Sequence, residues 1–113
     1  MSDSYYEHLF SVKDKVALVT GGTRGIGYMI AEGLVRCGAK VYVVSRKIDA
    51  CREAQEKLSK FGECIAIPSD ISDLAGCDTL ANELREREPR LHILVNNAGV
   101  TWSEDIDKFS EKA

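Results

Sequence analysis

Glycines gather directly after the first apolar run of the chain, in a pattern that can bind phosphate. Residues 20–27 read Thr-Gly-Gly-Thr-Arg-Gly-Ile-Gly and follow the apolar residues 16–19. A strand that ends in glycines and passes straight into a helix presents backbone N–H groups and a helix N-terminus, both of which favour a diphosphate. Gly21 would allow the tight turn, Gly25 the close approach of a ligand, and Gly27 the packing of the helix on the strand. The candidate binding residues of this turn are Gly21, Thr23, Arg24, Gly25, Ile26 and Gly27.

The spacing of these glycines, Gly-x-x-x-Gly-x-Gly, differs from the Gly-x-Gly-x-x-Gly of the best-known dinucleotide-binding folds. Taken alone, the segment could also be a simple turn after a strand. A second motif, Asn96-Asn97-Ala98-Gly99, follows another apolar run, and its small residues would let the backbone lie against a ligand.

The residues after the second apolar run bear on the choice of nucleotide. A site for NAD usually has a carboxylate there for the ribose hydroxyls, whereas the 2′-phosphate of NADP needs cations. This chain has Ser45, Arg46 and Lys47, and a guanidinium can bind a phosphate through two parallel hydrogen bonds. The sequence therefore favours NADP. Two alternatives stay open: Arg46 and Lys47 could simply be solvated, and Asp49 could be the ribose acid, although its place favours a helix start.

The two motifs together, in this order, resemble those of the short-chain dehydrogenase/reductase family, over about residues 13–109. Within the family, they look most like bacterial 3-oxoacyl-[acyl-carrier-protein] reductases and their rhamnolipid-associated relatives. The resemblance implies an NADP-dependent oxidoreductase that transfers hydride from NADPH to a carbonyl, such as a 3-oxoacyl thioester. Family members are commonly tetramers, so the resemblance allows a homo-oligomer, but the helices that build that interface resemble ones that this chain lacks, and the oligomeric state stays open.

The resemblance assigns further residues to the cofactor. Two cations match those that select NADP in the family, Arg46 and Arg24. Ser45 directly precedes Arg46. Asp70 matches the acid that bonds the adenine amino group, with Ile71 near the ring, although Asp70 could instead be a helix cap or a loop residue. The residues that match the segment running along the cofactor are Asn97, Ala98 and Gly99.

The family's catalytic residues have no match in this sequence. They are an Asn on the next helix, a Ser after the fifth strand and a Tyr-x-x-x-Lys pair, and none of the four tyrosines here is followed by lysine four positions later. We therefore predict no catalytic residue, and expect the chain to stop inside the fold, with Ser110 as the N-cap of a further helix. Three hypotheses follow: the N-terminal half of a reductase, a non-catalytic NADP-binding module, or an inert remnant.

Composition restricts the class of protein. With 113 residues the chain fits one domain, and we expect residues 1–113 to form a single truncated NADP-binding domain. A net charge of -3 argues against nucleic acid as a partner. The absence of a signal peptide and of a long apolar run argues against a membrane and favours the cytoplasm. The four cysteines lie 13 or 14 residues apart, so we predict reduced thiols and no metal site, with two disulfides as the alternative.

Apolar runs alternate with segments of helical periodicity, which predicts an α/β fold of the Rossmann type. We expect a doubly wound parallel sheet in the order 3-2-1-4, incomplete because the C-terminal strands are absent. The expected strands are residues 15–20, 41–44, 64–68 and 91–96, and the expected helices are residues 25–37, 49–60 and 72–88. We expect Gly33 to mark close packing on a strand. The apolar stripes of the three helices are predicted at Ile26, Ile30, Leu34 and Cys37; at Ala50, Ala54, Leu58 and Phe61; and at Leu74, Cys77, Leu80, Ala81 and Leu84.

Overall fold

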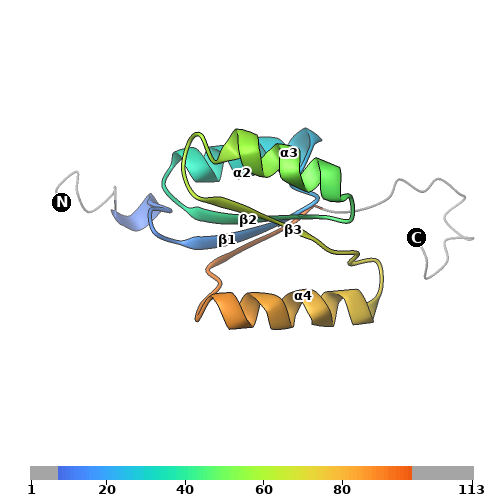
Figure 1. Ribbon diagram of the computed structural model, residues 1–113. Helices are drawn as coiled ribbons and strands as arrows, with labels where there is room; N and C mark the ends of the chain where they lie inside the picture. Colours follow the sequence, from blue (N-terminus) through green and yellow to red (C-terminus); the bar gives the residue numbers. More distant parts are fainter. Residues whose placement is uncertain (1–7, 98–113) are drawn as a thin grey trace, which may run out of the picture.

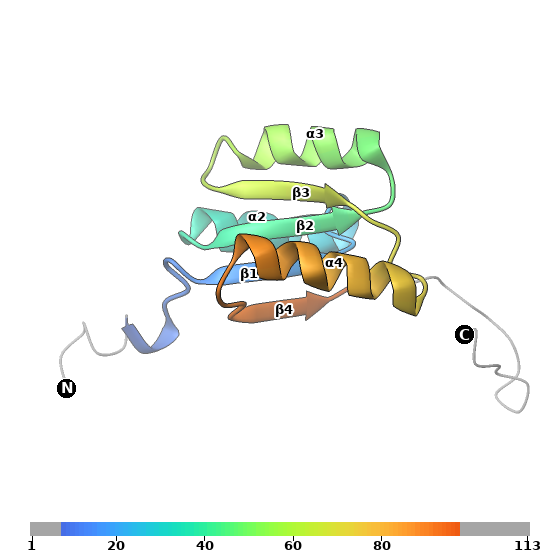
Figure 2. The same ribbon diagram turned by 60° about the horizontal axis from the view of Figure 1, so that its bottom comes forward.

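A computed structural model describes residues 8–97 and shows a parallel four-stranded sheet between two layers of helix (Figure 1). The strand order is β3-β2-β1-β4, which confirms the predicted Rossmann-type α/β fold, and Figure 2 shows β4 at one edge of the sheet. The elements are β1 (Val16–Thr20), α2 (Gly25–Arg36), β2 (Lys40–Ser45), α3 (Ile48–Leu58), β3 (Cys64–Pro68), α4 (Leu74–Arg87) and β4 (Ile93–Asn96).

The register of the sheet brings the carboxyl ends of its strands level. Thr20, the last residue of β1, pairs with Val44 on one side and with Asn96 on the other. Ser45 at the end of β2 pairs with Pro68 at the end of β3. The segments that follow these strands therefore share one edge of the sheet, which is where ligands bind in open α/β folds.

Two hydrophobic clusters hold the layers together. Helices α2 and α3 cover one face of the sheet and α4 covers the other (Figure 1). The first cluster includes Val19, Val35 and Leu58, and the second includes Leu80 and Leu84 of α4. All five residues of β1 are buried, as expected for a strand covered on both faces.

The predicted stripe of α2 was right for Ile30 and Leu34, which pack against the core, and wrong for its two end residues. The buried positions are Gly27, Ala31 and Val35, whereas Ile26 and Cys37 are exposed. Small side chains let the helix lie close to the sheet, and the larger Ile30 and Leu34 fill the flanks of the contact. The predicted role of Gly33 was also wrong, because Gly33 is exposed and a Cβ there would meet nothing within 4 Å.

The stripes of α3 and α4 were right only in part. Phe61 was expected in the core, but it is exposed and lies 3.7 Å below the Arg36 guanidinium, a cation–π contact. On α4, Leu80 and Leu84 are buried as predicted. The other predicted inward residues of α4 are exposed: Leu74, Cys77 and Ala81. Cys77 and Ala81 line an open groove between α4 and the strands β1 and β4, and this part of the apolar stripe is left uncovered.

Within residues 8–97, no helix has both the length and the apolar character needed to span a bilayer.

Candidate cofactor site at the carboxyl edge of the sheet

The glycine turn joins β1 to α2 and is fastened to β2. The Gly21 N–H donates to the carbonyl of Val44 over 2.9 Å. Gly21 has φ +65° and Gly25 has φ +62°, both in the left-handed region that favours glycine. A Cβ at Gly25 would meet nothing within 4 Å, so open space lies beside the backbone at that point. Gly21 therefore makes the predicted tight turn, and Gly25 leaves its backbone approachable.

Gly27 has no room for a side chain. A Cβ there would overlap the carbonyl oxygen of Gly21 and would lie 2.6 Å from Nδ2 of Asn97. The atoms nearest to such a Cβ belong to Gly21, which directly follows β1, and to Asn97, which directly follows β4, so Gly27 lets the start of α2 lie against the ends of these two strands. Gly22, which was not among the predicted residues, is similarly confined, since a Cβ would lie 2.7 Å from Cγ1 of Val43.

The first turn of α2 opens toward the same edge. Its N-cap residue, Arg24, is extended and makes no side-chain hydrogen bond to the helix, and the first turn contains no acidic residue. The partial positive charge of the helix N-terminus is therefore not neutralised by these groups. Arg24 and Ile26 are exposed here, and Thr23 is half-buried in the turn.

The end of β4 is tied to the glycine turn by hydrogen bonds. The backbone N–H of Asn97 donates to Oγ1 of Thr20 over 2.9 Å, and the side-chain amide of Asn97 donates to the carbonyl of Gly21 over 3.4 Å. The Thr20 hydroxyl lies 3.3 Å from Oδ1 of Asn96. Asn97 is thus brought to the glycine turn, as the two motifs suggested. The other two predicted residues of this segment, Ala98 and Gly99, lie outside the described residues.

The ends of β2 and β3 lie side by side at the same edge. The Ser45 carbonyl accepts from the N–H of Ser69 over 2.9 Å, which extends the pairing beyond β3. Ser72 lowers the pKa of Asp70, because its side chain and its backbone N–H both hydrogen-bond to the carboxylate, and the charge of Arg46 adds a smaller contribution in the same direction. Arg46 and Asp70 are both exposed beyond the ends of these two strands.

Three carboxylates near this edge have different local roles. Asp49 lies in the first turn of α3, which supports the helix-start interpretation over that of a ribose ligand. Asp73 is the N-cap of α4, and its Oδ1 accepts from the N–H of Gly76 over 2.7 Å. Asp70 accepts from Ser72 in the loop before that cap, so it does not cap the helix.

All four cysteines lie in the described part of the chain and carry free thiols, as predicted. Cys51 and Cys64 are buried, and Cys37 and Cys77 are exposed. Burial raises the pKa of the Cys64 thiol to about 11, so this thiol stays protonated at neutral pH.

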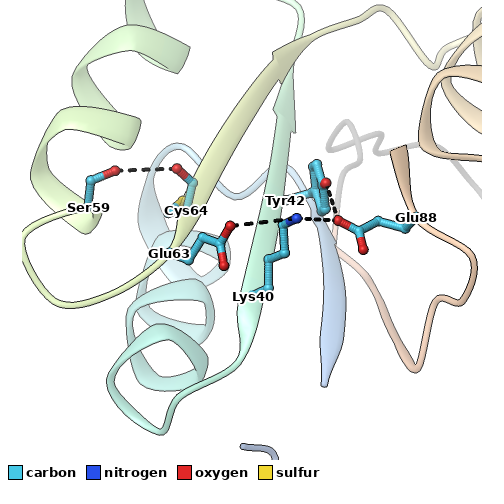
Figure 3. Close-up of polar contacts among 6 residues, drawn as sticks. All are labelled: Lys40, Tyr42, Ser59, Glu63, Cys64 and Glu88. Atoms are coloured by element: carbon cyan, nitrogen blue, oxygen red, sulfur yellow. Dashed lines mark hydrogen bonds and ion pairs between the residues drawn. The ribbon is translucent and has the colours of Figure 1, made fainter. Parts of the chain in front are cut away.

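The amino edge of the sheet carries a cluster that the sequence did not suggest (Figure 3). Lys40 Nζ lies 2.5 Å from Oε2 of Glu88 and 3.6 Å from Oε2 of Glu63. The Tyr42 hydroxyl donates to the same Glu88 oxygen. This cluster joins β2 to the residue that follows α4. At the same edge, His92 Nδ1 accepts from the N–H of Val16 over 2.9 Å, so this histidine helps to pair β4 with β1.

The sequence model of the family described as short chain dehydrogenase matches residues 15–113, and the chain therefore belongs to that family. A rhamnolipids biosynthesis 3-oxoacyl-[acyl-carrier-protein] reductase of Pseudomonas aeruginosa is 48% identical over 100 residues, covering 88% of this chain and 39% of its own. A tropinone reductase homolog of Datura stramonium is 39% identical over 103 residues, covering 89% of this chain and 38% of its own.

Two solved structures of reductases are also similar to this chain. The RhlG/NADP active-site complex of Pseudomonas aeruginosa is 52% identical, with a TM-score of 0.77, and the match covers 80% of this chain and 37% of that one. L-Sorbose reductase of Gluconobacter frateurii, complexed with NADPH and L-sorbose, is 34% identical, with a TM-score of 0.80 and coverage of 90% and 40%. This chain thus spans about two fifths of the length of these relatives.

Proposed function

We propose that residues 1–113 form one cofactor-binding domain that binds NADP(H) at the carboxyl edge of its sheet. The observation that carries this proposal is the glycine turn: Gly21 and Gly25 adopt left-handed conformations, and Gly27 has no space for a side chain. The turn opens into the N-terminus of α2 at the edge where nucleotides bind in such sheets. Relatives solved with NADP or NADPH support the choice of cofactor.

The residues at this edge divide among the parts of the cofactor. The diphosphate would lie against the glycine turn, where Thr23 and the backbone of Ile26 are also within its reach. Arg46, with Ser45 before it, and Arg24 would hold the 2′-phosphate, because a guanidinium matches phosphate geometry. Asp70 and Ile71 would contact the adenine. The segment proposed to run along the nicotinamide half is Asn97, Ala98 and Gly99.

The cofactor supplies hydride chemistry, and the chain's own residues bind and orient it. We propose that the parent reductase transfers hydride from NADPH to a carbonyl, and its 48% identical relative makes a 3-oxoacyl thioester the leading candidate. Reduction also needs a positioned proton donor, and this sequence has no Tyr-x-x-x-Lys pair to provide one. We therefore expect binding without turnover from these 113 residues alone.

Calorimetric titration of the purified protein with NADP and with NAD tests this proposal. We expect saturable binding of NADP with an affinity about tenfold or more above that for NAD, the scale of a hydrogen bond to a charged group. Equal affinities would contradict the choice of NADP, and absence of binding would favour an inert remnant. Oxidation of NADPH with a 3-oxoacyl thioester by this chain alone would contradict the expectation of no turnover.

A further inference from the structure

The first turn of α4 lies unusually close to the loop that follows β3. A Cβ at Gly76 would overlap the carbonyl oxygen of Asp70 and would lie 2.9 Å from the Asp70 carbonyl carbon. Both atoms belong to the backbone, so the obstacle could not move aside as a flexible side chain would. Glycine is unfavourable inside a helix, and here the space left by its missing side chain is filled by the chain itself.

Further contacts fix this turn against the loop. The Gly76 N–H donates to Oδ1 of Asp73 over 2.7 Å, so the position of Gly76 is held by the helix cap. The next residue, Cys77, has its thiol 3.5 Å from the carbonyl of Ile71, within range of a weak S–H hydrogen bond. Two consecutive residues of α4 therefore contact two consecutive residues of the loop, Gly76 at Asp70 and Cys77 at Ile71.

We infer that Gly76 and Cys77 are positioning residues for the adenine end of the NADP(H) site, because they set where the Asp70 and Ile71 backbone lies. The inference rests on the proposed function. It adds residues that would touch no cofactor atom and would act only through the loop.

A side chain at position 76 should affect the binding of only one end of the cofactor, the adenine. A methyl group at position 76 would displace the Asp70 backbone, and the carboxylate that accepts from Ser72 would move with it. The glycine turn lies at the end of β1, whereas the atoms nearest a Cβ at Gly76 belong to Asp70 and Asp73. Recognition of the adenine amino group should therefore be lost, while binding of the diphosphate is kept.

The test compares NADP with its hypoxanthine analogue, which lacks the amino group that Asp70 would bind. Calorimetry on the unmodified protein should give an affinity for NADP about tenfold above that for the analogue, the scale of a hydrogen bond to a carboxylate. In Gly76→Ala this ratio should fall to within about twofold of unity, with the affinity for the analogue almost unchanged. A merely structural effect would weaken both nucleotides alike.

The matched control is Gly33→Ala, a glycine in the exposed part of α2 where a Cβ would meet nothing. It should leave the ratio at its original value. Because Gly76→Ala could fail to fold, Cys77→Ala and Cys77→Ser provide a second pair of variants. Alanine removes the donor to the Ile71 carbonyl and should lower the ratio of the affinity for NADP to that for the analogue. Serine keeps a donor and should restore this ratio.

The outcomes separate the two proposals. A ratio unchanged in Gly76→Ala, or unchanged in Cys77→Ala if the first variant does not fold, would overturn the positioning role. Equal binding of the two nucleotides by the unmodified protein would overturn it as well. No binding of NADP at all would instead contradict the proposed function.

Discussion

The two edges of the sheet are built from different kinds of group. At the amino edge, Lys40 of β2 pairs with Glu63, which precedes β3, and with Glu88, which follows α4 and also accepts from the Tyr42 hydroxyl. At the carboxyl edge, glycines and backbone N–H groups dominate, and the charged residues Arg24, Arg46 and Asp70 are exposed. The charged groups of the amino edge therefore pair with one another, whereas those of the carboxyl edge stay exposed beside backbone N–H groups and can reach a ligand.

Gly27→Ala should have the largest effect, because it damages both the fold and the binding site at the carboxyl edge. The added Cβ would overlap the Gly21 carbonyl and crowd Asn97, so the turn would have to open. We expect a loss of about 3 kcal/mol in the free energy of unfolding, the upper end for overpacking, together with loss of detectable NADP binding. Urea unfolding and calorimetry would measure both. Gly33→Ala is the control and should be neutral or stabilising, because alanine favours a helix. Full NADP affinity in Gly27→Ala would contradict the role of this glycine.

Arg46→Asp should weaken the binding of NADP at the carboxyl edge and leave the stability of the fold almost unchanged. We expect NADP to bind about 1.5–3 kcal/mol more weakly, as for the loss of a hydrogen bond to a charged group. The free energy of unfolding should change by less than about 0.5 kcal/mol, since the residue is exposed. Calorimetry with NADP and with NAD measures the switch. If both nucleotides weakened equally, Arg46 would not be the group that reads the 2′-phosphate.

Glu88→Gln should have the opposite signature, affecting stability but not binding. The pKa of Glu88 is lowered, first by its hydrogen bond with Lys40 and then by that with Tyr42. A carboxylate with a lowered pKa stabilises the fold above its unfolded value of about 4.3, and this contribution disappears as pH falls through the folded value. We expect Glu88→Gln to cost about 1–2 kcal/mol at pH 7, the scale of a charged hydrogen bond, and progressively less below pH 4.

Urea unfolding of the original protein and of Glu88→Gln, at pH 7 and at pH 3, would check this. NADP affinity at pH 7 should be the same for both proteins. A stability difference that stays constant with pH would show that the Glu88 carboxylate is not the group responsible.

The smallest effect is expected for Glu32→Gln on the outer face of α2. Glu32 and Arg36 form an exposed i,i+4 ion pair, with Oε2 of Glu32 3.4 Å from Nε of Arg36. Such pairs contribute about 0.3–0.5 kcal/mol, and salt screens them. The loss should therefore fall within that range in low salt and should disappear in about 1 M salt, where the screening length is only a few ångströms. A larger loss would mean that the cation–π contact between Arg36 and Phe61 depends on Glu32.

The sequence predicted the strand order and the position of the glycine turn because both depend on local patterns. Apolar runs that alternate with helical periodicity leave few topologies for a short chain, and the turn residues follow β1 directly. The fold of residues 8–97 and the meeting of the turn with Asn97 could thus be anticipated.

Side-chain packing could not be predicted in the same way. On α2, two residues of the predicted stripe, Ile30 and Leu34, pack only at the side of the core, whereas the fully buried positions are Gly27, Ala31 and Val35. Glu88 and Lys40 are 48 positions apart in the sequence, and no local pattern predicts the ion pair between them. The confinement of Gly76 by Asp70 is likewise visible only once the α4 terminus is placed against the loop.

A titration of the isotopically labelled protein with NADP, monitored by the chemical shifts of its backbone amides, tests directly whether the carboxyl edge is the binding site. If NADP binds at the carboxyl edge, we expect saturable changes at Gly21, Gly25 and Ile26 of the glycine turn and at Arg46, with the amides of the Lys40 and Glu88 cluster almost unmoved. Saturable changes concentrated at the Lys40 and Glu88 cluster, or no saturable change at the glycine turn, would contradict the claim that the carboxyl edge is the binding site.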